Sequence, residues 1–380
     1  MKHIFIIGSR GLPAKYGGFE TFVEELVKHQ INKNIKYHVA CQSENSTLAK
    51  AGAHFEYFNA DCYAIKVPNI GPARVIAYDC LAINTALQII KEKQIHAPVF
   101  IILGNTIGGL ISHFAKKIHA IGGTLFVNPD GLEWKRTKWS APVRRYLKYA
   151  EQKMVQHADL MISDNQGILD YLTHTYGKIH SEVIAYGTAQ NYSDLTKSPT
   201  LVKYKVDSYA LIVGRFVPEN NYEALISGFM ASHSPHDLVI ITNYEGNPYY
   251  ETLLKKTHVD QESRRKVVGS VDDQNELRDI RENAVFYLHG HEVGGTNPGL
   301  LEARWSTPVN VVLDVNFNRE SACDSVIYFK KSQLTSVIDG LSVLTEIQKD
   351  KLHQKAQTLV KEKYTWEKIC KQYETLFLKE

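Results

Sequence analysis

VFYLHGHEVGGTNPGLLEARW, residues 285–305, contains the pattern that decides the fold of this chain. It begins with an apolar run, residues 285–288, of the kind that forms a buried parallel strand. A loop of histidines, glycines and polar residues follows, and Pro298 then suits the first turn of a helix. Loop glycines expose backbone N–H groups, and a helix N-terminus carries partial positive charge. The stretch therefore predicts an anion-binding site.

Several side chains of this loop and helix are candidates for contact with the anion or with a sugar attached to it. Glu302 lies about one turn into the helix, where its carboxylate can accept a hydrogen bond from a hydroxyl group. Ligands of open parallel sheets bind at the carboxyl ends of the strands, where these residues gather. An ordinary turn with a surface glutamate is the alternative. The candidates are His289, His291, Gly294, Gly295, Thr296, Asn297 and Glu302.

The chain of 380 residues is too long for one ordinary hydrophobic core, which predicts two domains. Strand-like and helix-like segments alternate as in a parallel sheet with helices on both faces. A polar, weakly periodic segment over 188–207 interrupts this rhythm, which then restarts. We therefore predict an α/β protein with doubly wound domains over 1–190 and 207–350, and a C-terminal helix over 351–380 that packs back on the first domain.

Composition restricts the protein to a few functional classes. Lys+Arg 44 against Asp+Glu 41 is nearly balanced, so nothing in the net charge calls for a nucleic-acid partner. The five cysteines show neither a CxxC pair nor metal-ligand spacing, which is typical of reduced thiols in a cytosolic protein. The apolar run at residues 2–8 is too short for a signal peptide, and no run approaches the ~20 apolar residues of a membrane span. We expect a cytoplasmic protein whose membrane contacts are peripheral.

The loop after the first strand, GSRGLPAKYGGFE at 8–20, is rich in glycine but lacks the GxGxxG fingerprint. The second strand also ends without the acidic residue that binds the ribose of NAD, so an NAD-dependent enzyme is not favoured. Gly17 and Gly18, directly before a helix, allow a phosphate or sugar to approach the backbone. A tight turn with no ligand is the alternative.

Polar residues also follow strands in both predicted domains. Arg215 ends the first strand of the second domain, and its planar guanidinium suits a diphosphate. Asp130 follows a strand of the first domain and is a candidate to orient a hydroxyl group or act as a base; an Asp-Gly turn is its alternative. Asn165 closes the last strand of that domain. No HExxH motif occurs, and no third ligand accompanies His289 and His291, so we expect no metal.

Basic and aromatic residues alternate after Asp130. Trp and Tyr favour lipid interfaces while Lys and Arg meet anionic headgroups, so the pattern favours a peripheral membrane patch. Nucleic-acid binding and a plain solvated helix face are the alternatives. The residues of this basic-aromatic segment are Trp134, Lys135, Arg136, Lys138, Trp139, Arg144 and Arg145, with Tyr146, Lys148 and Tyr149 beside them.

Motifs distributed over the whole chain carry a resemblance to a known family. They are GSRGLPAKYGGFETFVEEL (8–26), NPDGLEWKRTKWS (128–140), GRFVPENN (214–221), HGHEVGGTNPGLLEA (289–303) and YTWEKICKQYETLF (364–377). The sequence resembles the family-four retaining glycosyltransferases, and these motifs look like the bacterial β-1,4-rhamnosyltransferases of streptococcal rhamnose-polysaccharide and capsule assembly. The resemblance implies a GT-B fold, a dTDP-β-L-rhamnose donor held by the second domain in an interdomain cleft, and no metal or other cofactor. The implied acceptor is GlcNAc linked to undecaprenyl diphosphate at the inner face of the cell membrane.

The resemblance also implies residue roles. Glu302 matches the family's ribose-binding glutamate, and Arg215 matches its diphosphate-binding arginine. Two positions depart from the family pattern, because Gly294 replaces a second glutamate and Asn220 replaces a lysine. These departures predict a donor pocket remade for a 6-deoxy sugar, with Asn220 and the backbone N–H groups of residues 294–297 among the donor contacts.

We expect Arg215 and the backbone of residues 295–297 to stabilise charge on the departing dTDP. Asp130, Asn165, His289 and His291 are expected to contact the rhamnose or the attacking hydroxyl group. Transfer of another dTDP- or UDP-sugar, a nucleotide-sugar epimerase of the same fold and a sugar-binding protein without turnover are the alternatives. A homodimer is left open.

Overall fold

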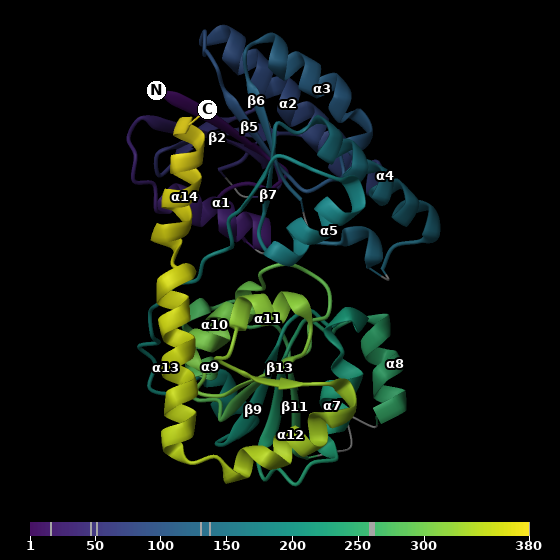
Figure 1. The fold of residues 1–380 in the computed structure, drawn as a ribbon, viewed down its shortest axis with the longest axis vertical. Helices are drawn as coiled ribbons and strands as arrows, with labels where there is room; N and C mark the ends of the chain where they lie inside the picture. The colour runs from purple at the N-terminus through teal and green to yellow at the C-terminus, as the bar shows by residue number, and fades with distance from the viewer. Residues whose placement is uncertain are drawn as a thin grey trace. The chain divides into compact units, whose positions relative to one another are not determined.

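The computed structural model describes residues 1–15, 17–45, 48–50, 52–129, 131–136, 138–257 and 263–379. The chain divides into two compact units. Unit 1 contains Met1–Gly187 and Trp366–Glu380, and unit 2 contains Thr188–Thr365. Each unit has its own sheet with helices around it (Figure 1). Unit 2 therefore begins with the polar segment that the sequence analysis places between two domains.

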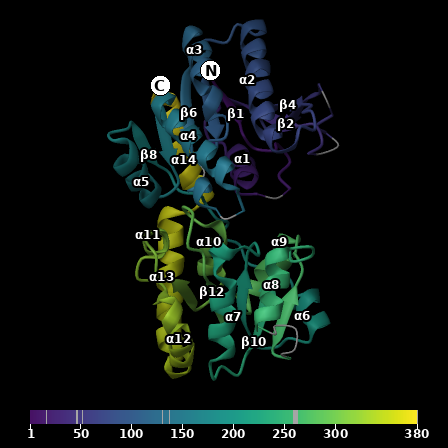
Figure 2. The same cartoon turned by 90° about the vertical axis from the view of Figure 1, so that its right-hand side faces the viewer.

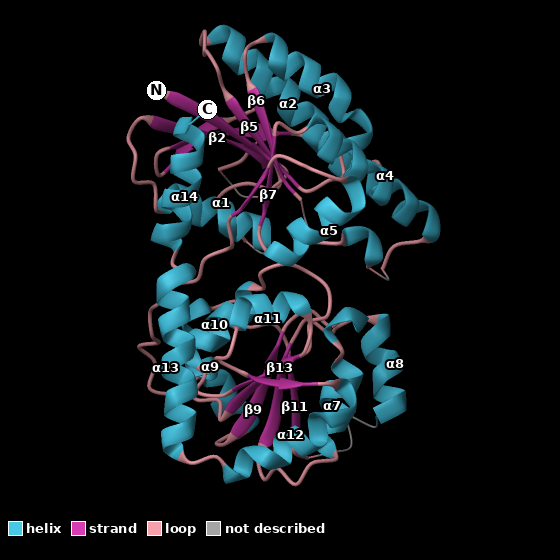
Figure 3. Ribbon diagram, viewed as in Figure 1, coloured by secondary structure: helices cyan, strands magenta, loops and turns pink. Residues whose placement is uncertain are grey.

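The strands of unit 1 alternate with helices along the chain. The strands are β1 (Lys2–Ile7), β2 (Ile35–Gln42), β3 (His54–Tyr57), β4 (Ala60–Ile65), β5 (Val99–Leu103), β6 (Thr124–Asn128), β7 (Leu160–Ser163) and β8 (Ser181–Val183). The helices are α1 (Gly18–Lys28), η1 (Gly71–Ala73), α2 (Arg74–Glu92), α3 (Gly108–Ala120), η2 (Glu133–Lys135), α4 (Ala141–His157), α5 (Gln166–Tyr176) and α14 (Trp366–Lys379). Figure 3 distinguishes these strands from the helices that surround them.

Within the described residues, the sheet of unit 1 has the strand order β3-β4-β2-β1-β5-β6-β7-β8. Among the strands described for this unit, only β3 runs antiparallel to its neighbour. The chain moves outward from β1 to one edge, then returns and continues from β5 to the other. The direction of winding therefore reverses between β1 and β5, where doubly wound sheets bind ligands.

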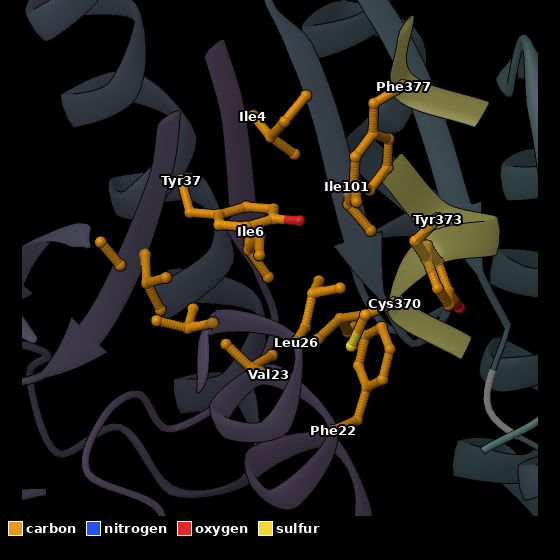
Figure 4. Packing of buried hydrophobic residues seen from close by; sticks show 14 of the residues in the cluster. Ile4, Ile6, Phe22, Val23, Leu26, Tyr37, Ile101, Cys370, Tyr373 and Phe377 are labelled. Atoms are coloured by element: carbon orange, nitrogen blue, oxygen red, sulfur yellow. The ribbon is translucent and has the colours of Figure 1, made fainter. Parts of the chain in front are cut away.

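The core of unit 1 joins the two ends of the chain. Strands β1 and β5 are buried almost throughout, because helices cover both faces of the sheet. Figure 4 shows Cys370, Tyr373 and Phe377 of α14 packed near Ile4 of β1 and Phe22 of α1. Helix α14 contacts both α1 and β1, so the C-terminal segment is part of the first unit's core.

The C-terminal segment differs from the predicted single helix over 351–380. Helix α13 (Glu346–Lys363) ends in unit 2, and α14 begins at Trp366 in unit 1. Between them, the Thr188 N–H donates to the Tyr364 carbonyl at 2.7 Å, and Thr188 pairs with Thr365 in a parallel bridge. This pairing requires extended backbone, which explains why the helix stops there.

The long helix over Gly71–Lys93 is the candidate membrane span found in the described residues by length and composition, which the sequence analysis did not anticipate. It packs, however, against β1 and β4 as a core helix does. Tyr78, Ala82 and Ile83 are buried on its inner face, and the Tyr78 hydroxyl donates to the Ser9 carbonyl at 2.8 Å.

Unit 2 repeats the doubly wound plan. Its strands are β9 (Tyr209–Val213), β10 (Asp237–Ile241), β11 (Arg265–Val268), β12 (Phe286–His289), β13 (Asn310–Leu313) and β14 (Ile327–Phe329). Its helices are α6 (Pro199–Tyr204), η3 (Pro218–Asn220), α7 (Tyr222–Met230), α8 (Pro248–Thr257), α9 (Gln274–Glu282), α10 (Pro298–Ser306), α11 (Asn316–Ala322), η5 (Lys331–Gln333), α12 (Leu334–Gly340), η6 (Leu341–Val343) and α13. Figure 2 shows β12 of this unit among α10, α7 and α13.

The described strands of unit 2 form a fully parallel sheet in the order β11-β10-β9-β12-β13-β14. The winding reverses between β9 and β12. The chain leaves these two strands at Gly214 and at His289, so the sheet topology brings the predicted arginine and histidine motifs to one switch point.

Candidate functional site

The carboxyl ends of β9 and β12 are in direct contact. A methyl group added to Gly214, just after β9, would lie 3.2 Å from Cε1 of His291, so the imidazole ring lies against this glycine. A methyl group added to Gly290, just after β12, would lie 2.5 Å from the carbonyl oxygen of Asn220. Gly290 therefore needs a residue without a side chain, and at Gly214 a methyl group would press on the imidazole ring. The two loops predicted to form one site do meet.

Side-chain amides fix these two loops to each other. Nδ2 of Asn221 donates to the Gly290 carbonyl at 2.8 Å, and the Glu292 N–H donates to the Glu219 carbonyl at 3.0 Å. Nδ2 of Asn220 donates to the carbonyl of Arg215 at 2.8 Å, and Asn220 is buried. The structure thus uses this Asn220 amide to hold the turn that carries Arg215, a role that the predicted donor contact did not include.

The guanidinium group of Arg215 is available to a ligand. Arg215 is exposed, and within the described part of the chain its guanidinium has neither an ion pair nor a hydrogen bond. Its position directly after Gly214 places it beside the switch point of the sheet. An unpaired guanidinium at such a position suits a phosphate or diphosphate group, which it can contact with two N–H donors.

His289 and His291 stack on each other at the end of β12. Their ring centroids are 4.3 Å apart and their planes differ by 12°. His289 is 1% exposed, and neither of its ring nitrogens has a partner among the described residues. Burial disfavours the charged form of His289, and the neighbouring His291 adds a smaller effect of the same sign. The pKa of His289 is therefore well below its ordinary value. His289 is therefore a neutral ring that offers one donor and one acceptor.

The loop before α10 presents backbone N–H groups. Gly294 has φ 144°, a conformation that favours glycine, and among the described residues the N–H groups of Gly294 and Gly295 have no acceptor. Thr296 is buried, and Asn297 caps α10 by accepting from the N–H of Leu300 at 3.2 Å. The loop therefore has the backbone N–H groups and the helix N-terminus predicted for an anion site. The Asn297 side-chain oxygen caps the helix.

Glu302 has a partner that the sequence analysis did not find. One carboxylate oxygen, Oε2, lies 2.5 Å from Nη2 of Arg281, which is 3% exposed on α9. The glutamate itself is partly exposed, in the second turn of α10. No spacing rule could have shown this pair, because β12 and the glycine loop separate the two residues in sequence.

The predicted phosphate contact at Gly17 and Gly18 in unit 1 meets an obstacle. Gly17 has φ 131° at the start of α1, and a methyl group added there would collide with Oε2 of Glu20. The other oxygen of Glu20 accepts from the Arg10 N–H at 2.9 Å. A carboxylate therefore already occupies the positive end of this helix and would repel an anion. The structure favours the tight-turn alternative at this pair.

Asn165 and Asp130 are two further predicted site residues of unit 1. Asn165 is 1% exposed and caps α5, because its side-chain oxygen accepts from the Gly167 N–H at 2.9 Å. That oxygen therefore already accepts a hydrogen bond within the protein, whereas the sequence predicts that Asn165 contacts substrate. Asp130 lies outside the described residues, so its predicted role stays a prediction.

A single carboxylate organises the start of the basic-aromatic segment. Glu133 pairs with Nε of Arg136 and Nζ of Lys138, both at 2.7 Å, and accepts from the indole N–H of Trp139 at 2.8 Å. Burial opposes its charge, but Arg136, Lys138 and Trp139 together lower the pKa of Glu133. Glu133 therefore offsets one of the positive charges expected at a membrane and holds Arg136 and Lys138 within the segment.

Other members of the segment face solvent. The indole of Trp134 donates to the Tyr171 hydroxyl at 3.0 Å, so this ring is anchored to the protein. Nε of Arg144 donates to the Trp134 carbonyl at 2.9 Å, although the residue as a whole is exposed. The exposed cations of the segment are Lys135, Lys138, Arg144 and Arg145, and Tyr149 is exposed as well. In the described residues no group of three or more His, Cys, Asp or Glu could hold a metal ion.

One family model and several solved structures match this chain. Residues 1–189 match a family model described as a domain of unknown function, DUF1972. No curated protein sequence matches the chain. Sucrose-phosphate synthase from Thermosynechococcus elongatus is similar in structure, with a TM-score of 0.81 at 13% identity over 100% of this chain and 99% of that one. The chain has the GT-B fold.

Two other GT-B structures are similar over their whole length. The UDP-forming α,α-trehalose-phosphate synthase from Burkholderia vietnamiensis has a TM-score of 0.72 at 9% identity, covering 100% of both chains. A structure described as trehalose-6-phosphate from E. coli bound with UDP-2-fluoro glucose has a TM-score of 0.69 at 11% identity, covering 99% of both chains. The predicted GT-B fold is confirmed. At these identities the likeness concerns the fold.

Proposed function

We propose that this chain is a retaining glycosyltransferase. It transfers L-rhamnose from dTDP-β-L-rhamnose to GlcNAc on undecaprenyl diphosphate, with a β-1,4 linkage and without a metal ion. The reaction takes place at the inner face of the cell membrane, during assembly of a cell-wall rhamnose polysaccharide or capsule. The fold supports transfer, because similar structures include sucrose-phosphate and trehalose-phosphate synthases, one of them bound with UDP-2-fluoro glucose.

One observation carries the proposal. At the switch point of unit 2, the exposed Arg215 follows the end of β9, and the loop after β12 contains the N–H groups of Gly294 and Gly295; none of these groups has a partner among the described residues. The N-terminus of α10 follows, with Glu302 in its second turn. Positive charge for a diphosphate and a carboxylate for a sugar hydroxyl are the two elements of a nucleoside-diphosphate site.

The chemistry follows from the charges at this site. The bond between the anomeric carbon of the sugar and the diphosphate oxygen breaks, and the acceptor hydroxyl oxygen forms the new bond to the same carbon. Negative charge grows on the departing dTDP, where Arg215 and the loop N–H groups stabilise it. The departing phosphate takes the proton of the acceptor hydroxyl, so retention needs no protein nucleophile. Arg215 and the helix N-terminus supply charge that a metal ion supplies elsewhere.

The residue at position 294 supports a 6-deoxy sugar. Gly294 stands where the resembling family has a glutamate, so one polar side chain is missing from the loop. A sugar with a methyl group instead of a hydroxymethyl group needs fewer polar partners. The loop thus suits rhamnose better than a hexose that keeps its 6-hydroxyl group, and transfer of another dTDP- or UDP-sugar is the second candidate.

The exposed cations of unit 1 support an anionic lipid acceptor. Lys135, Lys138, Arg144, Arg145 and Tyr149 are exposed, while Trp134 and Trp139 are anchored through their indole N–H groups. Membrane contact in this proposal rests on the four cations and the tyrosine rather than on the two tryptophans.

Ligand binding tests the proposal first. Thermal unfolding of the purified chain with dTDP, UDP or GDP should show the largest rise in Tm with dTDP, because a ligand of the native state stabilises it. Arg215→Ala should lose most of this rise. Arg319→Ala, which removes an exposed arginine paired with Asp314 in the same unit, is the matched control and should keep it.

Turnover then separates the candidate reactions. With dTDP-rhamnose and a GlcNAc-diphosphate lipid, transfer should occur only when both substrates are present, and Arg215→Ala should raise KM for the donor and lower kcat. An epimerase would alter the nucleotide sugar without any acceptor. A binding protein would show the Tm shift and no product. Unchanged turnover in Arg215→Ala would refute the assigned role of Arg215.

A further inference from the structure

The carboxylate of Glu302 is held from one side only. Side chains on a helix lean toward its N-terminus, so Glu302 leans toward the glycine loop and the start of α10. Its Oε2 contacts Nη2 of Arg281 at 2.5 Å, and its other oxygen, Oε1, has no partner within the described part of the chain. The carboxylate therefore has one oxygen committed to the protein and one oxygen available to a ligand.

Arg281 is well placed to keep this arrangement. It is 3% exposed near the end of α9, and α9 packs against α10. Its own carbonyl accepts from the Thr307 hydroxyl at 2.8 Å, which ties the end of α9 to the end of α10. A buried guanidinium deprived of its carboxylate would be an unpaired buried charge, so the ion pair should persist when a ligand binds.

We propose that Arg281 is a positioning residue that makes the nucleotide site prefer 2′-deoxyribose over ribose. This inference rests on the proposed function, since it concerns the nucleotide of the donor. An unengaged carboxylate can accept from two neighbouring hydroxyl groups of ribose, one on each oxygen. With Oε2 occupied by Arg281, the other oxygen of Glu302 can still accept a hydrogen bond from the single 3′-hydroxyl of a deoxyribose.

A ribose would meet a penalty at this site. Its 2′-hydroxyl would leave water and face a carboxylate oxygen that already contacts a guanidinium nitrogen and is therefore a weaker acceptor. A desolvated hydroxyl without a good partner lowers affinity, by about tenfold for a group of this kind. A pocket alone discriminates weakly against an added hydroxyl, so this preference is expected to be moderate.

The test compares two ligands that differ only in the 2′-hydroxyl, dTDP and 5-methyluridine diphosphate. Calorimetric titration of the full chain should give a Kd for dTDP about tenfold lower. Arg281→Gln should bring the two Kd values close together by releasing Oε2. Arg281→Lys, which keeps a cation at the position, should retain a preference for dTDP.

Two further variants separate positioning from general damage. Arg304→Gln removes another buried arginine, from α10 itself, whose Nη1 donates to the Ser321 carbonyl rather than to Glu302. It should lower stability and leave the ratio of the two Kd values unchanged. Glu302→Ala should weaken both ligands and remove the preference, and adding Arg281→Gln to it should change the ratio no further.

The outcomes distinguish this inference from the proposed function. Equal binding of the two ligands by the unaltered chain, or an unchanged ratio in Arg281→Gln, overturns the role of Arg281 and leaves a nucleotide site in place. If neither nucleoside diphosphate binds, the proposed function fails and the inference fails with it. A preference for dTDP that disappears only in the Arg281→Gln and Glu302→Ala variants supports both.

Discussion

Replacing Asp79 with asparagine should remove a pH-dependent loss of stability from unit 1. Asp79 lies on α2 and is 2% exposed, and its Oδ1 has no hydrogen-bond partner in the described residues. Burial raises the pKa of this carboxyl from 3.8 to about 8. Because no positive group among the described residues offsets the burial, the folded protein holds Asp79 in its neutral form near pH 7.

The sign and size of the effect follow from this pKa. Between pH 3.8 and about 8, the unfolded chain has lost the Asp79 proton and the folded chain has kept it. The unfolded state binds fewer protons, so stability falls as pH rises, by at most about 1.4 kcal/mol per pH unit. From pH 5 to pH 7 the loss reaches about 3 kcal/mol, and above the folded pKa it levels off. Asparagine does not titrate and has no such loss.

Urea unfolding at several pH values measures this difference. Trp305 is the single tryptophan of unit 2, so a Trp305→Phe background leaves tryptophan fluorescence that reports on unit 1 alone. The unfolding free energy of Asp79→Asn minus that of the same chain with Asp79 should increase steadily from pH 5 to pH 7. Taking this difference against pH removes any constant cost of placing an amide in the site.

Two results would contradict the reasoning. A difference that does not change between pH 5 and pH 8 would mean that Asp79 titrates normally in the folded chain. A difference that falls as pH rises would mean that the folded protein stabilises the charged carboxylate, through a partner that burial alone does not reveal.

Other predictions concern the core, a helix contact and substrate binding. Phe377→Ala, at a buried ring near Tyr37, should cost about 3–5 kcal/mol of unfolding free energy by urea titration, and a loss under 1 kcal/mol would contradict the core placement of α14. Gly108→Ala should lower Tm, because its methyl group would collide with the carbonyl oxygen of Ala150; an unchanged Tm would refute this contact. Arg144→Glu with Arg145→Glu should weaken flotation with anionic liposomes and slow transfer to lipid acceptors more than to soluble analogues, whereas equal slowing would remove the membrane role. Asp130→Asn should abolish transfer while dTDP binding persists, and equal loss of both would indicate a structural residue.

Several features could be predicted from sequence because neighbouring residues encode them. Apolar runs ending in Gly214 and His289 marked two strand ends, and a parallel sheet brings such ends to one edge. Pro298 after a glycine loop marked the start of α10. The GT-B fold followed from the two repeats of this rhythm and from the motif resemblance.

Other features of the candidate site depended on pairs that no local pattern shows. Arg281 was missed because its partner, Glu302, is reached only after β12 and the glycine loop have folded back beside α9. Gly17 looked like a phosphate contact until the structure showed the Glu20 carboxylate at the same helix start. Asn220 stays a predicted donor contact, and only the structure shows that its amide holds the carbonyl of Arg215.

The sequence by itself determined where strands and helices begin, which of their ends carry polar residues, and how many times the doubly wound plan occurs. Tertiary structure alone decided which carboxylate meets which cation, why the C-terminal helix breaks at Tyr364 and Thr365, and that Oδ1 of the buried Asp79 has no partner among the described residues. The physical reason is the sequence distance over which each kind of interaction acts. Backbone preferences and hydrophobic periodicity act among near neighbours, whereas ion pairs and burial depend on elements that meet only after the sheets have formed.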